Sequence, residues 1–268
     1  MEIKGQDSIL RLIDSQTTST FPNSLILLGE KGGGKHLLCQ YIADKLNLTA
    51  VTLSDNLSQE LIEELYTRVE PYLYIIEEET LTVKRQNMIL KFLEEPLKNS
   101  FIVILSSNKQ FLLPTIINRC QVWELAKYSV EILKEFSSFP DSMLFDIVRT
   151  PGEVLKVEKC HTNFNDLINL LDKLIEKTAV ANFSNVLTIS DKIDFDNKDD
   201  GKFDILIVVR TLVWLVQRKI LESVSAGKYY KCYELISELS YNLTIPNINK
   251  KLCFENFLTK MKRISIYG

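Results

Sequence analysis

Glycine and proline are scarce in this chain of 268 residues, which holds nine glycines and seven prolines. Together with 46% hydrophobic and 25% charged residues, this excludes collagen-like and disordered low-complexity classes. Long apolar runs are also missing. The longest, residues 205–216, contains Arg210 and Thr211 and falls short of the roughly 20 residues that a membrane span needs, so it predicts a buried helix. With no basic start followed by an apolar run, we expect a cytoplasmic protein with no membrane partner.

Paired cysteines are absent as well. The five cysteines are scattered without a C-x-x-C pair, and Cys160-His161 has no further ligands at metal-binding spacing. Neither a zinc site nor a disulfide framework is indicated. We expect reduced, mostly buried thiols and no metal site.

Charge is divided unevenly along the chain. Residues 201–268 carry 11 Lys and Arg against 5 Asp and Glu, whereas residues 1–200 carry 21 against 30. A basic segment of this kind can mark a partner surface. Solvated helix faces would give the same count, and both interpretations stay open.

The first half of the chain alternates short β-rich apolar runs with helical segments, the pattern of a parallel sheet with crossover helices. The predicted strands are Ser24–Leu28, Ala50–Leu53, Leu73–Ile76, Phe101–Ser106 and Gln121–Trp123. The predicted helices between them are Lys35–Leu46, Gln59–Val69, Thr82–Leu93 and Leu112–Asn118. This order predicts a doubly wound α/β nucleotide-binding layer.

The strand signals largely stop near residues 137–141, and Thr150-Pro151-Gly152 opens a new helix. Beyond this point the chain is predicted to be entirely helical. The expected helices are Phe164–Lys177, Phe203–Val224, Tyr229–Leu243 and Asn247–Ile264, with a polar loop at residues 194–201. The fold class is therefore α/β followed by all-α.

A glycine-rich turn follows the first predicted strand and opens the next helix. It matches the pattern G-x-x-x-x-G-K of a phosphate-binding loop, whose backbone N–H groups surround phosphate oxygens. A turn of purely structural purpose is the alternative. The candidate nucleotide-binding residues of this phosphate loop (residues 29–36) are Gly29, Gly32, Gly33, Gly34, Lys35 and His36.

Two positions depart from the pattern of an active ATPase. His36 stands where Ser or Thr would place a hydroxyl oxygen on Mg²⁺, and imidazole nitrogen suits that hard cation poorly. The apolar strand that ends in Glu77 and Glu78 has the form of a Walker B element, but Glu77 occupies the usual place of Asp. A surface acidic turn is the alternative there. Magnesium–nucleotide chemistry is therefore not expected.

Several longer motifs resemble those of AAA+ DNA polymerase clamp-loader subunits. Residues 87–96 are similar to N-x-L-L-K-x-L-E-E-P, and residues 112–121 to L-L-P-T-I-x-S-R-C-Q, with Asn118 as the departure from its S-R-C core. Ser107 and Asn108 resemble the end of the sensor 1 strand. Residues 242–258 are similar to the closing helix of the family's oligomerisation collar. The resemblance spans nearly the whole chain.

Within that family, the chain resembles the bacterial DNA polymerase III delta-prime subunits. The hydrolysing subunits carry a four-cysteine zinc module and a sensor 2 arginine at the start of the lid helix, and this sequence has neither. Residues 150–155 resemble the delta-prime pattern S-P-G-x-A-L, with Gly152 at the arginine position. Many delta-prime subunits retain the zinc module, so its absence from this sequence is a departure from their pattern.

The resemblance implies an AAA+ domain at residues 1–139, a helical lid at 140–198 and a helical collar at 199–268. It implies a hetero-pentameric ring with ATPase and clamp-opening subunits that loads a sliding clamp onto primer-template DNA. Arg119 would be an arginine finger for a neighbour's ATP site. No cofactor is required, and ATP or ADP would bind weakly at most. Lys84 and Arg85 begin the helix that lines the DNA chamber in the family.

Two other functions remain open from the sequence. The chain could be an ATP-hydrolysing clamp-loader subunit, if the substitutions at His36 and Glu77 are tolerated. More distantly, it could belong to another AAA+ loader or initiator, which would have to explain the motif at residues 93–96 and the collar match. We expect a subunit of the DNA polymerase III holoenzyme that is not an active ATPase alone.

Overall fold

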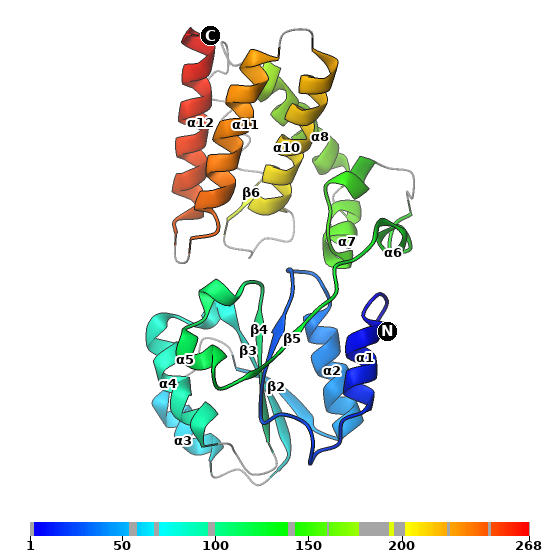
Figure 1. Ribbon diagram of the computed structural model, residues 1–268, viewed down its shortest axis with the longest axis vertical. Helices are drawn as coiled ribbons and strands as arrows, with labels where there is room; N and C mark the ends of the chain where they lie inside the picture. Colours follow the sequence, from blue (N-terminus) through cyan, green and yellow to red (C-terminus); the bar gives the residue numbers. More distant parts are fainter. Residues whose placement is uncertain are drawn as a thin grey trace. The chain divides into compact units, whose positions relative to one another are not determined.

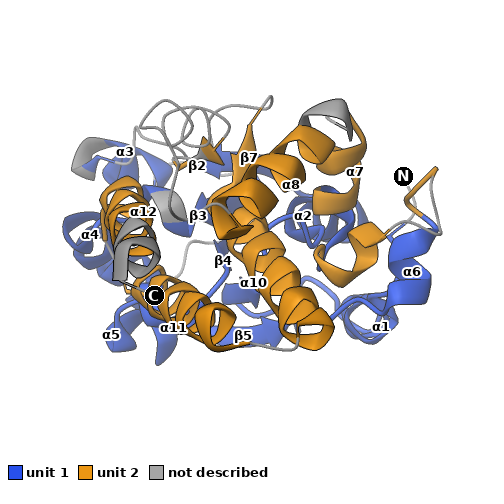
Figure 2. Cartoon of the chain, turned by 90° about the horizontal axis from the view of Figure 1, so that it is seen from above, with its two compact units in different colours: residues 1–135, 149–152 blue, residues 136–148, 153–268 orange. Residues whose placement is uncertain are grey.

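The structure is a computed structural model of the chain. It describes residues 3–53, 58–66, 70–95, 100–138, 143–159, 161–176, 193–195, 202–223, 226–245 and 248–267. The chain divides into two compact units (Figure 2), and each is described by itself. Unit 1 comprises residues 1–135 and 149–152, and unit 2 comprises residues 136–148 and 153–268.

Unit 1 is built on a five-stranded parallel sheet in the order β2-β3-β4-β1-β5. The strands are β1 (Ser24–Leu28), β2 (Thr49–Leu53), β3 (Tyr72–Glu77), β4 (Phe101–Ser106) and β5 (Gln121–Glu124). Each predicted strand is confirmed to within a residue at either end. Because consecutive strands β1 and β2 are not neighbours, the sheet is wound in two directions from β1, as the sequence predicts.

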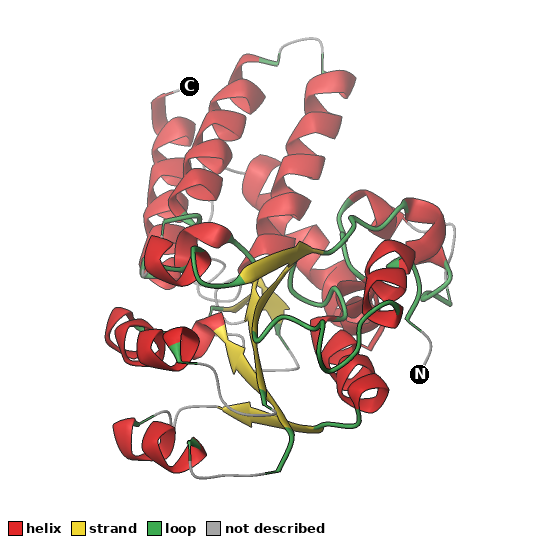
Figure 3. Cartoon of the chain, turned by 60° about the horizontal axis from the view of Figure 1, so that its bottom comes forward, coloured by secondary structure: helices red, strands yellow, loops and turns green. Residues whose placement is uncertain are grey.

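Helices cover both faces of this sheet (Figures 1 and 3). On one face lie α1 (Asp7–Asp14) and α2 (Lys35–Leu46), and on the other lie α3 (Gln59–Leu65), α4 (Val83–Glu94) and α5 (Pro114–Ile117). Residues of β1 alternate between the two cores, so that Leu25 and Leu27 pack under α2 while Ile26 packs under α4. A three-layer domain with its loops at the strand ends results.

The predicted helices of unit 1 are confirmed with shifts at their ends. Helix α2 has the predicted bounds, and α3 begins as predicted and ends at Leu65, while residues 67–69 of its predicted range lie outside the described residues. The predicted helix at residues 112–118 narrows to α5, because Pro114 fits only the start of a helix and Asn118 is its C-cap. Helices α1 and α6 (Val130–Lys134) were not predicted. Short 3₁₀ turns follow two strands, η1 (Glu78–Thr80) and η2 (Lys109–Phe111).

Unit 2 contains η3 (Met143–Asp146), α8 (His161–Glu176), α10 (Ile205–Glu222), α11 (Gly227–Asn242), α12 (Lys250–Tyr267) and most of α7 (Pro151–Lys159). The helix predicted to open at residues 150–152 is confirmed as α7. Helix α10 packs against both α8 and α11, and α11 packs against α12. The apolar run at residues 205–216 lies in α10, largely buried, as predicted. Within the described residues, no helix has the length and apolar character to cross a membrane.

The expectation of an entirely helical second half is wrong in one place. Strands β6 (Ile193–Asp194) and β7 (Phe203–Asp204) form a short parallel pair. Phe203 therefore belongs to a strand, and its ring lies 5.4 Å from that of Phe164. Asp204 then caps α10, because its Oδ1 accepts a hydrogen bond of 2.7 Å from Leu206 N. The helix consequently begins two residues later than predicted.

The first unit ends at Glu135, four residues before the predicted boundary, and residues 149–152 return to it. The second unit holds both the expected lid and the expected collar. The division of these helices into two domains stays a prediction. The predicted loop at residues 194–201 lies largely outside the described residues, apart from Asp194 in β6 and Phe195.

Candidate functional site

The phosphate loop joins β1 to α2 at the edge of the sheet where the parallel strands end. Gly32 and Gly34 have φ values of 76° and 86°, which lie in the left-handed region that favours glycine. Gly34 is also the N-cap of α2. These two glycines let the chain turn sharply from strand to helix, as the motif predicts.

The lysine of the loop is turned onto its own backbone. Lys35 Nζ donates hydrogen bonds to Gly29 O at 2.5 Å and to Glu30 O at 3.1 Å. A second donor comes from the segment that follows β5, where Tyr128 Oη lies 2.9 Å from Gly33 O. Burial raises the pKa of Tyr128, so its hydroxyl stays protonated and donates. Both contacts bind carbonyl groups of the loop.

A segment at residues 149–152, which we call the strap, also contacts the loop within unit 1. Thr150 Oγ1 donates to Lys31 O at 2.9 Å, and Gly152 N donates to Gly32 O at 3.0 Å. Thr150 is buried, with 2% of its surface exposed. Gly152, which the resemblance places at the sensor 2 arginine position, thus touches the loop with its backbone.

His36 and Glu77, the two departures from the ATPase pattern, are partners. His36 Nε2 lies 2.9 Å from Glu77 Oε1, and both side chains are partly exposed. In a hydrolysing site these two positions would both face a metal ion. Here one side chain binds the other directly.

Glu78 is held by the residues after β4. Ser106 Oγ and Ser107 Oγ both donate to its carboxylate, and Ser107 N lies 2.9 Å from Glu78 Oε2. Asn108 contacts this cluster only with its backbone, whose oxygen lies 3.0 Å from Ser106 Oγ. Its side-chain Oδ1 accepts instead from Gln110 N at 3.0 Å and caps η2. The predicted Walker B and sensor 1 segments therefore meet through Ser107 and Glu78.

Fold and motif together imply a magnesium–nucleotide at the phosphate loop, but the side chains present do not fit one. Mg²⁺ takes oxygen ligands in strict octahedral geometry. At the position of the hydroxyl ligand stands the imidazole of His36, which binds Glu77. The carboxylate of Glu78, which would polarise water in a hydrolysing site, accepts three hydrogen bonds from Ser106 and Ser107. No hydrolysis step is assigned to this site.

Arg119 lies elsewhere in unit 1. It follows α5 and precedes β5, whose Gln121 is paired with Leu25 at the beginning of β1. The phosphate loop follows the other end of β1. Because the strands are parallel, Arg119 and the phosphate loop flank opposite edges of the sheet. The guanidinium cannot serve the loop of its own chain.

Two contacts orient the Arg119 side chain, which is 36% exposed. Its Nη2 lies 2.5 Å from Oε1 of Glu94, the last residue of α4, and its Nη1 donates to Thr115 O at 2.9 Å. A guanidinium has five N–H donors, so these bonds leave others for a further anion. Glu94 belongs to the motif at residues 93–96.

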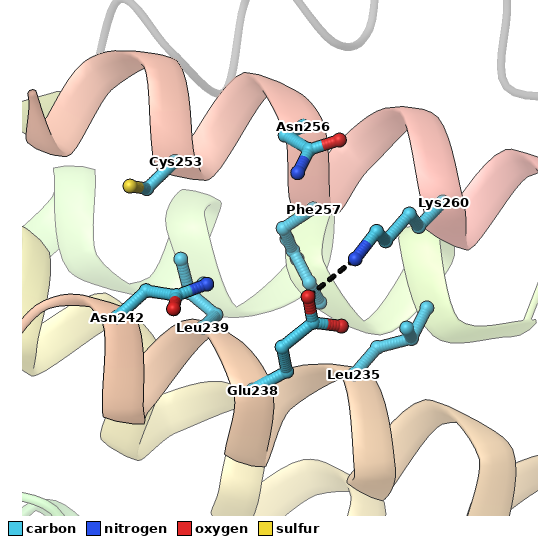
Figure 4. A pocket seen from close by; sticks show the side chains of 8 residues that line it. All are labelled: Leu235, Glu238, Leu239, Asn242, Cys253, Asn256, Phe257 and Lys260. Carbon is cyan, nitrogen blue, oxygen red and sulfur yellow. Dashed lines mark hydrogen bonds and ion pairs between the residues drawn. The ribbon is translucent and has the colours of Figure 1, made fainter.

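Sequence reasoning missed three residues of this arrangement. Tyr128 and Thr150 contact the loop from 95 and 119 positions away. Thr150 lies in the recognised motif at residues 150–155, but no local pattern indicates either contact. Glu94 was part of a recognised motif, but its pairing with Arg119 was not predicted. The small cavity between α11 and α12, near the Lys260–Glu238 ion pair (Figure 4), is far too small for a nucleotide.

Comparison with known proteins supports the fold first. The RuvB Holliday junction branch migration motor of Thermotoga maritima aligns with a TM-score of 0.50 at 18% identity, covering 96% of this chain and 87% of that one. At this identity the likeness shows the fold alone. Together with the phosphate loop after β1, it shows a fold of the AAA+ type.

The segment that matches a known family lies in the first half of the chain. The family described as "DNA polymerase III, delta subunit" matches residues 51–129. The delta' subunit of DNA polymerase III from Haemophilus influenzae is 40% identical over 63 residues, 24% of this chain and 19% of that subunit. The delta' subunit from Bacillus subtilis is 48% identical over 50 residues, 18% and 15% of the two chains. Over this segment the chain is similar to delta-prime subunits of the DNA polymerase III clamp loader. The matches span less than a fifth of either relative.

Proposed function

We propose that this chain is a non-hydrolysing clamp-loader subunit that assembles with ATPase partners and donates Arg119 to a neighbour's ATP site. The assembly would load a sliding clamp onto primer-template DNA in the cytoplasm. The observation that carries the proposal is the placement of Arg119, exposed and at the opposite sheet edge from its own phosphate loop. An arginine so placed lies away from the phosphate loop of its own chain, which supports a role at a phosphate that another subunit holds.

The state of the chain's own loop supports the same role. Lys35 binds loop carbonyls, His36 binds Glu77, and Glu78 is occupied by serine donors. An ATP-hydrolysing subunit would need these groups free to face a metal ion and water. Weak binding of ATP or ADP, without hydrolysis, is compatible with this arrangement.

Unit 2 offers surfaces for assembly. Helices α10, α11 and α12 expose large apolar side chains, among them Leu221 at 87%, Tyr241 at 70% and Leu252 at 62%. We assign them to the collar that would hold the hetero-oligomer together.

The test is ATP hydrolysis by the complex reconstituted with its ATPase partners, stimulated by clamp and primed DNA. Arg119→Ala should leave assembly intact and lower hydrolysis at the adjoining site by roughly 10³-fold or more. Arg11→Ala is the matched control, because Arg11 is also exposed on unit 1 and also donates to a backbone carbonyl. Unchanged hydrolysis in an intact Arg119→Ala complex would overturn the proposal.

A further inference from the structure

The carbonyl groups of the phosphate loop are all bound by the chain itself. Lys35 binds those of Gly29 and Glu30, and Gly33 N also donates to Glu30 O at 3.1 Å. The carbonyl group of Lys31 accepts from the Thr150 hydroxyl. Those of Gly32 and Gly33 accept from Gly152 N and from the Tyr128 hydroxyl. A turn whose carbonyls are satisfied in this way needs no ligand to fix its shape.

The strap approaches the loop backbone to backbone. A Cβ atom added to Gly152 would lie 2.7 Å from Gly32 Cα and 3.0 Å from Gly32 O. Backbone atoms cannot swing aside as the end of a side chain can, so only glycine fits at position 152 while the strap is in place. An arginine there would have to displace the strap. The missing sensor 2 arginine thus has a steric explanation.

We propose that the phosphate loop of this chain has become a structural clasp, which binds the strap in place of a nucleotide as its ordering contact. The clasp fixes the start of α7, because Pro151 and Gly152 are the first residues of that helix. Its donors from the strap are a hydroxyl and an amide, both uncharged, so the clasp holds across the physiological pH range. This inference does not depend on the role of Arg119.

The test is hydrogen–deuterium exchange of the intact chain, read at the amides of Gly33 and Gly152, with and without Mg²⁺ and ADP. In the unaltered chain both amides should exchange slowly, and ADP should not slow them further. Gly152→Ala should speed exchange at the loop and strap by at least tenfold. Gly227→Ala is the matched control, because Gly227 also lies in the first turn of a helix and a Cβ there meets nothing within 4 Å.

A second pair of variants covers the case in which Gly152→Ala fails to fold. Thr150→Val removes the hydroxyl that binds Lys31 O, whereas Thr150→Ser keeps it. Exchange should rise in the first and match the unaltered chain in the second. The proposal is overturned if Thr150→Val or Gly152→Ala exchanges no faster than its control, or if the loop of the unaltered chain becomes protected only when ADP is added. Neither result bears on the proposed role of Arg119. That role is tested only by ATP hydrolysis in the reconstituted complex.

Discussion

His36 Nε2 and Glu77 Oε1 lie 2.9 Å apart, so the two residues that depart from the ATPase pattern contact each other. In a hydrolysing subunit, a hydroxyl and an Asp carboxylate at these positions would both serve the metal ion. The imidazole instead provides a donor for the carboxylate directly. The two departures from the ATPase pattern therefore form one contact within the site.

The first prediction concerns this pair. Calorimetric titration of the unaltered chain with Mg²⁺ and a non-hydrolysable ATP analogue should show no magnesium-dependent binding up to millimolar ligand. The double variant His36→Thr/Glu77→Asp restores two oxygen ligands and should gain such binding, whereas His36→Ala/Glu77→Ala should not. Micromolar, magnesium-dependent binding by the unaltered chain would instead favour the ATP-hydrolysing alternative.

The second prediction concerns Glu94. Its carboxylate and a neighbour's γ-phosphate would compete for the N–H groups of Arg119. Because the pair is exposed, it contributes at most about 1 kcal/mol. Glu94→Gln should therefore raise ATP hydrolysis by the reconstituted complex, at limiting ATP, by up to roughly fivefold. A decrease of similar size would contradict competition and would mean that Glu94 holds the guanidinium in its productive orientation. Glu95→Gln, one residue beyond the end of α4, is the control.

The third prediction concerns Cys39 on α2, a fully buried thiol whose pKa burial raises to about 12. The folded protein therefore keeps this proton more tightly than the unfolded chain. The resulting stability is complete below the unfolded thiol's pKa near 9 and is lost as pH rises from there towards 12. We compare the unfolding free energies of the unaltered chain and of Cys39→Ala. Their difference should shrink by up to about 1.4 kcal/mol per pH unit in this window. Denaturant titrations at pH 8, 9 and 10 measure it, and a constant difference would contradict it.

Much of unit 1 is predictable because its signals are local. Five apolar runs with turns at their ends gave β1 to β5 to within a residue, and the glycines of the phosphate loop gave its position between strand and helix. The apolar run before Glu77 and Glu78 likewise predicts their position, since Glu77 ends β3 and Glu78 follows it. Each of these assignments depends on residues that lie next to one another in the chain.

The parts that were missed depend on distant partners. Nothing near Thr150 or Tyr128 indicates that its hydroxyl binds a loop more than 90 residues away. Phe203 reads as the start of a long apolar helix, and only its pairing with Ile193 and its contact with Phe164 make it a strand. Gly152 was noticed as a missing arginine, but its close approach to Gly32 is visible only in three dimensions.

The last prediction concerns two truncated fragments, one of which ends at the boundary of unit 1. Removing residues 203–268 would delete α10, against which α8 packs, and would expose the buried side of α8 at Leu167, Leu171 and Ile175. We therefore expect the fragment 1–202 to aggregate and to bind an apolar dye. The fragment 1–135 ends at the boundary of unit 1 and retains both of its buried clusters. It should be monomeric and melt cooperatively, although without the strap its phosphate loop should exchange faster than in the full chain. A fragment 1–135 that fails to fold, beside a well-behaved 1–202, would show that unit 1 depends on residues beyond its own clusters.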